Sequence, residues 1–201
     1  HVYYHIPVRH GTDTALALSA CQVVISEGLV DWGFAASQTD LSLLVRIDTG
    51  EFLRQSHVEA DGNDERFFQA HPDRGVVPAD PASLRLDFET LAEGTLEVET
   101  LDAGRIPVEP LFARLRRMLE EPYTPEQAAE ICEVHPDSIR MLARKVAARI
   151  TRTIPEAGVC KHYHGDLMCR GKALLLGLTG NWGKKGAGLG SWNSFMFDGN
   201  S

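Results

Sequence analysis

The sequence predicts an α/β fold in which a parallel sheet carries helices and is interrupted by a long loop and β-hairpins. Two strand-and-helix units point to it: residues 5–9 (HIPVR) precede a helix at 12–27, and residues 151–160 precede a helix at 166–178. A strand followed by a polar turn and a helix is the first half of a parallel α/β unit. The ends of such strands are where these folds bind ligands.

Turn residues between these two units predict hairpins and an insertion. Apolar runs flank Asp48-Thr49-Gly50 and again Asp102-Ala103-Gly104, as they do in hairpins. Residues 57–93 are polar, contain prolines and lack periodicity, so we expect a surface loop there. We divide the chain into three parts. Residues 1–57 are the first part of an α/β domain, and residues 58–108 are a loop and hairpin insertion. Residues 109–201 continue the same α/β region with a helical hairpin, a strand, a pocket-forming helix and a glycine-rich loop.

Three further helices are predicted after the insertion. Residues 110–121 have helical spacing, and residues 124–134 and 135–150 each open with a proline in the first turn. The last two could form a helix-turn-helix, because the second carries four basic residues. Four acidic residues in the same stretch cancel that charge, so we expect a packed amphipathic helical hairpin instead of a DNA-binding one.

The composition argues against two classes of partner. The chain has 201 residues, a net charge of −8 and an isoelectric point near 5.5, which does not suit nucleic-acid binding. No apolar run approaches the roughly 18 residues that span a bilayer, so no direct membrane insertion is expected.

The four cysteines form no CxxC pair, which favours small buried side chains over a zinc or iron–sulfur site.

The most informative segment is 158–192, in which polar donors precede an apolar helix and a basic, glycine-rich turn follows it. The turn matches neither a Walker A loop nor a GxGxxG fingerprint. Hydrogen-bond donors lie at one end of this helix, and glycine backbone without side chains lies beyond its other end. This arrangement suits the binding of a large anionic cofactor. Surface histidines and a flexible loop are the alternative interpretation. The polar residues are Lys161, His162, Tyr163 and His164 before the helix, and Lys184, Lys185 and Trp192 after it.

Four segments in order resemble the large subunit of molybdenum oxidoreductases of the dimethyl sulfoxide reductase superfamily. They are IPVRHGTDTALALS, EGLVDWGFAASQTDLSLLVRIDTGEFLR, YTPEQAAEICEVHPDSIRMLARKVA and KHYHGDLMCRGKALLLGLTGNWGKKGAGLGSW. More narrowly, they resemble the branch that contains respiratory nitrate, selenate, chlorate and perchlorate reductases, dimethyl sulfide dehydrogenase and ethylbenzene dehydrogenase. The resemblance covers nearly the whole chain apart from the loop at 58–93.

The resemblance implies a Rossmann-like region that binds molybdenum bis(molybdopterin guanine dinucleotide). The implied activity is transfer of oxygen atoms and electrons, either in hydrocarbon hydroxylation or in oxyanion reduction. The turn at residues 11–13 would read the guanosine part of one dinucleotide. By resemblance, the cofactor-binding residues are Gly11, Thr12, Asp13, Lys161 and His162, and the catalytic residues are Lys161, His164 and Trp192.

We expect the turn at residues 11–13 and the face that carries Lys161 and Trp192 to border one cleft, sized for an elongated pterin nucleotide. His10 is a departure from the pattern, since the family usually has proline there. The ligands of a four-iron four-sulfur cluster and the aspartate that binds molybdenum are expected upstream of His1. We therefore assign no metal ligand in this chain and expect an internal fragment that is inactive alone.

The resemblance also implies partners. An iron–sulfur electron-transfer subunit and, as a further candidate, a haem subunit would pass electrons in anaerobic respiration, and the substrate would be a small molecule. The compartment stays open between the periplasmic and cytoplasmic faces of a prokaryotic inner membrane. The alternative function is a non-catalytic scaffold subunit that keeps the fold within a respiratory complex.

Overall fold

The computed structural model describes residues 4–79, 85–87, 89–154, 158 and 161–190. The chain forms two compact units, each with its own core. The first, called here the helical unit, combines His1–Asp31 with Leu119–Ser201. The second, the hairpin unit, is Trp32–Met118.

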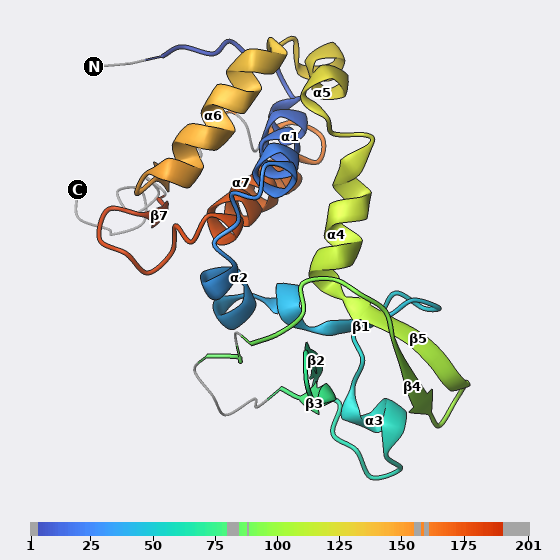
Figure 1. Cartoon of the computed structure of the whole chain (residues 1–201). Helices are drawn as coiled ribbons and strands as arrows, with labels where there is room; N and C mark the ends of the chain where they lie inside the picture. Colours follow the sequence, from blue (N-terminus) through green and yellow to red (C-terminus); the bar gives the residue numbers. More distant parts are fainter. Residues whose placement is uncertain (1–3, 80–84, 88, 155–157, 159–160, 191–201) are drawn as a thin grey trace, which may run out of the picture. The chain divides into compact units, whose positions relative to one another are not determined.

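The helical unit packs four helices together, with α1 and α7 side by side and α6 against α1 (Figure 1). Arg144 of α6 donates two hydrogen bonds to the Glu27 carboxylate after α1, at 2.7 and 2.8 Å, and these bonds lower the pKa of Glu27. The elements are α1 (Asp13–Ser26), α5 (Pro125–Cys132), α6 (Pro136–Ala148), β6 (Arg152–Thr153), α7 (Gly165–Leu178) and β7 (Gly188–Leu189).

Helices α1 and α7 run in the same direction. Gly11, just before α1, lies against His162, just before α7. Further along, a Cβ at Gly171 would lie 3.1 Å from the Ala17 Cβ. Past the end of α1, the Asp31 N–H donates to the carbonyl of Leu178, the last residue of α7, at 2.8 Å. The two helix N-termini are therefore at the same end of the pair.

The hairpin unit is built from antiparallel strands. Strand β5 pairs with β1 on one side and with β4 on the other, and β2 pairs with β3. Apolar side chains from both sheets form one core that includes Leu44, Leu53, Phe68 and Val108. The elements are α2 (Trp32–Gln38), a 3-10 turn η1 (Asp40–Ser42), β1 (Leu44–Arg46), α3 (Gln55–Val58), β2 (Phe68–His71), β3 (Gly75–Pro78), β4 (Leu96–Thr100), β5 (Gly104–Pro110) and α4 (Leu111–Glu120), which crosses into the helical unit.

The described residues have the mixed helix and strand content that the sequence predicts, but they do not show the Rossmann-like parallel sheet. The sheets are mostly antiparallel, and β6 and β7 pair in parallel over only two residues each. Residues 5–9 form no strand. Their alternating apolar side chains, Ile6 and Val8, pack against the helical core, and the Arg9 N–H bonds to the Cys132 carbonyl at the end of α5. The apolar residues do alternate, but they pack against helices and not within a sheet.

The prediction of a continuous surface loop at 57–93 is also wrong in part. It contains the hairpin β2–β3, whose first strand is fully buried. Gln69 is a polar residue of this strand, and its side-chain amide donates hydrogen bonds to Ser42 Oγ at 2.8 Å and to the Asp87 carbonyl at 3.1 Å. Hydrogen bonds of this kind allow a polar side chain to be buried.

Other predicted elements are confirmed. The helices at α1, α4, α5, α6 and α7 form, as does the β4–β5 hairpin. Strand β1 turns back through Gly50 to bridge Phe52. The glycines of both predicted turns have left-handed backbones, with φ of +78° at Gly50 and +69° at Gly104. Glycine adopts such angles without the strain that a Cβ would introduce.

Candidate functional site

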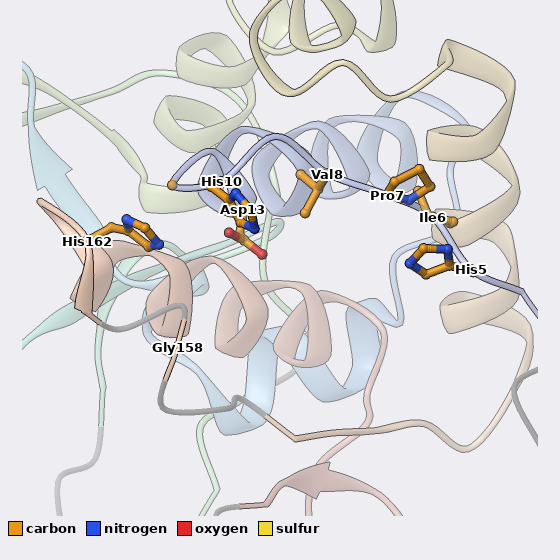
Figure 2. A pocket seen from close by; sticks show the side chains of 9 residues that line it. His5, Ile6, Pro7, Val8, His10, Asp13, Gly158 and His162 are labelled. Carbon is orange, nitrogen blue, oxygen red and sulfur yellow. The ribbon is translucent and has the colours of Figure 1, made fainter.

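A cavity of about 830 Å³ lies in the helical unit, at the end where α1 and α7 begin. Its walls come from three segments: the extended residues before α1, the first turn of α1 and the residues before α7 (Figure 2). Volumes of roughly 300–1,000 Å³ are usual for small-molecule and cofactor sites. The lining residues are His5, Ile6, Pro7, Val8, His10, Gly11, Asp13, Gly158 and His162.

The turn before α1 is closed by hydrogen bonds from Thr12. Its N–H and its hydroxyl both donate to the Arg9 carbonyl, at 3.2 and 2.6 Å. Thr12 is the residue before the helix, but its hydroxyl does not cap the helix. Gly11 has a φ of +80°, which glycine adopts readily. The turn therefore directs Asp13 into the cavity from the first helical position.

The start of α1 has unused backbone donors. Among the described residues, no hydrogen bond uses the N–H groups of Asp13 or Thr14. Helix N-termini also carry partial positive charge, and α7 begins at the same end of the pair. This end of the cavity therefore favours polar or anionic ligand groups, while Ile6, Pro7 and Val8 provide an apolar wall.

Two imidazoles stand beside Gly11. A Cβ at Gly11 would lie 3.5 Å from Cγ of His162, so Gly11 is in close proximity to that ring. The rings of His10 and His162 are nearly parallel, with 18° between their planes and 6.5 Å between their centroids. Both rings face the same cavity as Asp13 (Figure 2).

Comparison with known proteins gives relatives along most of the chain. A perchlorate reductase subunit alpha from Dechloromonas aromatica (strain RCB) is 34% identical over 94% of this chain and 24% of its own length. A respiratory nitrate reductase subunit alpha from Haloferax mediterranei is 37% identical over 89% of the chain and 20% of its own length. A chlorate reductase subunit alpha from Ideonella dechloratans is 32% identical over 98% of the chain and 22% of its own length. No family model matches.

The chain belongs to the dimethyl sulfoxide reductase family. Within that family the chain is similar to the branch of the perchlorate, nitrate and chlorate reductase alpha subunits, as the four sequence segments predicted. The chain spans about a fifth to a quarter of the length of these relatives.

The structure brings only some of the family-derived site residues together. Gly11, Asp13 and His162 line the cavity, and Thr12 closes the turn between them. Lys161 and His164 are exposed and do not line it. Trp192 lies outside the described residues.

Residues 161–164 form a turn and not the end of a strand. The alternation of side chains expected for a strand therefore does not apply. His164 precedes α7 with a φ of +57°, and its ring contacts that of Tyr163 at a centroid distance of 3.9 Å. Tyr163 itself is 89% exposed.

The glycine-rich turn borders a second cavity of about 340 Å³. Lys184 Nζ lies 3.8 Å from the Asp31 carboxylate in its wall. The buried Asn181 fixes the turn's start, because its side chain accepts from the Thr151 N–H and donates to the Val146 carbonyl. A side chain at Gly180 would collide with the Asp31 carboxylate. The group that lies close to the bare backbone of Gly180 is therefore a side chain of the same protein.

Two other observations limit the chemistry of the described part of the chain. It contains no group of three or more His, Cys, Asp or Glu side chains placed to hold a metal ion. None of its helices combines the length and the apolar character that crossing a membrane requires.

Sequence reasoning missed His5 and His10 as cavity residues. His10 was noted only as a departure from the family's proline, and His5 only as part of an expected strand. Their spacing gives no helical or strand signal for a shared site. The adjacency of His10 to the Gly11 turn was the signal that could have indicated it.

Proposed function

We propose that this chain is part of the catalytic subunit of a molybdenum oxidoreductase and holds the guanosine part of one dinucleotide of its bis(molybdopterin guanine dinucleotide) cofactor. One observation carries the proposal. Gly11 and Asp13, before and in α1, line one cavity with His162, before α7. The family relationship supports the enzyme class, and the cavity supports the place of binding.

The chemistry of the cavity suits a guanosine. The Asp13 carboxylate can accept two N–H groups from the edge of a guanine. The unused N–H groups at the start of α1 can donate to polar ligand oxygens, and the apolar wall can cover a ring face. The volume of about 830 Å³ accommodates a nucleoside.

The intact enzyme would use this arrangement for oxygen-atom transfer. When bound, the molybdenum cofactor supplies the redox chemistry, and the chain's residues position it and shape its surroundings. The three relatives are named for perchlorate, nitrate and chlorate, which favours oxyanion reduction over hydrocarbon hydroxylation. Their designation as alpha subunits supports further subunits, which we propose to be an iron–sulfur electron-transfer subunit and a haem subunit, with a four-iron four-sulfur cluster in the catalytic subunit.

Replacing Asp13 with alanine should weaken cofactor binding about 10- to 100-fold, because a hydrogen bond to a charged group contributes roughly 1.5–3 kcal/mol. Guanine nucleotide released from the purified full-length subunit, together with its molybdenum content, measures the effect. Asp137→Ala is the matched control, since Asp137 is also in the first turn of a helix but is exposed and lines no part of this cavity. Unchanged cofactor content in the Asp13 variant would refute the assigned role.

Lys161 has a different expected role. Its side chain is exposed and lies outside the cavity, which separates it from the residues proposed to hold the guanosine. From the family resemblance we propose that its ammonium stabilises negative charge that develops on the substrate. Lys161→Ala in the full-length enzyme should lower kcat about 100-fold while molybdenum content stays near that of the wild type. Arg105→Ala, which removes an exposed cation of the hairpin unit, should leave kcat unchanged. Parallel loss of molybdenum and kcat would show that Lys161 retains the cofactor instead.

Metal analysis of the intact protein separates the enzyme from the scaffold alternative. About one molybdenum per subunit is expected for the enzyme. A purified, folded subunit without molybdenum, from cells that supply the cofactor to a related enzyme, would favour the scaffold.

A further inference from the structure

Strand β4 of the hairpin unit has a neighbouring strand on one side only. It is the outer strand of the sheet β1-β5-β4, and within the described residues it pairs with β5 alone (Figure 1). Side chains alternate along it: Leu96 and Val98 pack against the core of the unit, while Glu97 and Glu99 are exposed. An outer strand presents unpaired backbone groups along its open edge, where a further strand can pair.

The hairpin register shows which backbone groups of β4 point to the open edge. Thr100 and Gly104 form the pair that closes the hairpin, and residues of an antiparallel strand direct their backbone groups alternately toward and away from the partner. The N–H and C=O groups of Glu99 and Glu97 therefore point away from β5. The Leu101 N–H follows the same alternation, since it donates to the His57 carbonyl of α3 at 2.8 Å. No hydrogen bond from another described segment uses the backbone groups of Glu97 or Glu99.

The two glutamates make this edge selective for charge. Within the described residues Glu99 has no ion pair, and Glu97 has only an exposed one, with Arg105 Nε at 3.7 Å. In a sheet, opposite charges on facing residues attract each other and like charges repel. A second copy of β4, paired antiparallel at this edge, would place glutamate beside glutamate. A strand with lysine or arginine at every second position would instead place a cation beside each glutamate.

We propose that the open edge of β4 is the docking site for an extended segment of another subunit of the enzyme, with lysine or arginine beside Glu97 and Glu99 and apolar residues between them. In such strand addition, main-chain hydrogen bonds give affinity and the alternate side chains give specificity. The relatives are named alpha subunits, which supports a partner chain. This proposal rests on the further subunits of the proposed function, and it is independent of the cofactor cavity.

Hydrogen exchange resolved to single amides tests the proposal, on the full-length catalytic subunit alone and on the enzyme assembled with its other subunits. The Glu97 and Glu99 amides should exchange rapidly in the isolated subunit. In the assembled enzyme they should exchange about tenfold more slowly or slower still, because a hydrogen-bonded amide exchanges only when its bond opens. The Val98 amide, which points toward β5, is the internal reference and should exchange slowly in both samples.

Three variants separate main-chain pairing from charge. Glu99→Pro removes an outward N–H, which an outer strand tolerates, and should weaken subunit association about tenfold. Glu99→Lys keeps the N–H but reverses the charge, and should weaken association about three- to tenfold. Glu65→Lys makes the same reversal at an exposed glutamate of the hairpin unit outside β4, and should leave association unchanged. Circular dichroism and urea unfolding check that each variant is folded.

The outcomes separate this proposal from the proposed function. Rapid exchange at Glu97 and Glu99 in an assembled enzyme that contains molybdenum would overturn the docking site and leave the proposed function standing. Slow exchange already in the isolated subunit would also overturn the docking site, because the subunit's own chain would then cover the edge. Wild-type association of the folded Glu99→Pro variant, or equal effects of Glu99→Lys and Glu65→Lys, would contradict it too. Unchanged cofactor content in Asp13→Ala refutes the cofactor site and not this interface.

Discussion

Replacing Arg46 with alanine is expected to lower the free energy of unfolding of the hairpin unit by about 2–3 kcal/mol. The Arg46 side chain is only 3% exposed. Its guanidinium donates two hydrogen bonds to the Asp48 carboxylate, at 2.8 and 3.1 Å, and two to that of Asp102, at 2.9 and 3.2 Å. Alanine would leave a cavity under two facing carboxylates.

Arg46 contributes this much to stability because its side chain joins two turns that are far apart in the sequence. Asp48 belongs to the turn after β1, and Asp102 belongs to the turn between β4 and β5. Both carboxylates are partly exposed, so solvent screening limits their contribution, and the expected loss is below that for a fully buried ion pair. Urea unfolding followed by tryptophan fluorescence, to which Trp32 of this unit contributes, measures the change.

The contribution of Arg46 should depend on pH in a defined direction. Its hydrogen bonds hold the pKa of both Asp48 and Asp102 below the ordinary value of about 3.9. Because the folded-state pKa values are lowered, the stabilisation is complete above about pH 4 and is lost as the pH falls through them. The difference in stability between wild type and Arg46→Ala should therefore shrink below pH 4.

Arg105→Ala is the matched control for Arg46→Ala. Arg105 lies on β5 of the same sheet, but its side chain is 73% exposed and its ion pair with Glu97 is 3.7 Å long. Exposed pairs contribute little. Equal destabilisation by the two variants would show that the buried guanidinium has no special role.

Replacing Gly171 with leucine should destabilise the helical unit by about 1–3 kcal/mol, because added methylenes in a packed interface force backbone shifts. A Cβ at Gly171 would already lie 3.1 Å from the Ala17 Cβ, across the α1–α7 contact. The Gly171 carbonyl also accepts a hydrogen bond from the buried Cys21 thiol at 3.8 Å, and burial raises the pKa of that thiol. Leucine would separate the two helices at whose N-terminal ends the cavity lies.

Gly171→Ala provides the size-graded control. Alanine is tight by a few tenths of an ångström, but it gains about 1 kcal/mol of helix preference over glycine, so we expect little net change. The leucine variant should unfold at lower urea concentration than the alanine variant and should bind guanosine monophosphate more weakly. Wild-type stability in the leucine variant would contradict the α1–α7 packing described here.

The sequence predicted local elements well where turns and caps decide them. Gly50 and Gly104 end their turns in left-handed conformations, and Thr124 and His135 cap α5 and α6 as the prolines at the next position suggested. These features depend on residues a few positions apart. The patterns that identify them are therefore visible without the fold.

The sheet arrangement could not be predicted in the same way. Ile6 and Val8 alternate as strand residues do, but the sequence does not show that helices receive them. The buried position of Arg46 depends on Asp102, which lies in another turn, and that of Gln69 depends on Ser42 and Asp87. Pairings over such sequence separations follow from the tertiary structure.

The same distinction applies to the site. The family resemblance indicated the turn at residues 11–13 and the segment at 161–164, and the structure places His162 of that segment beside the turn. The expected cleft shared with Lys161 and Trp192 stays a prediction, since Lys161 lies outside the cavity and Trp192 outside the described residues. His10 entered the site through its distance from His162, which no local pattern reveals.

A structure of the cofactor-loaded full-length subunit tests the central claim most directly. We expect the guanine of one dinucleotide inside the cavity, with its edge about 2.7–3.2 Å from the Asp13 carboxylate. A loaded subunit in which protein side chains fill this cavity, with both guanines bound elsewhere, would contradict the account.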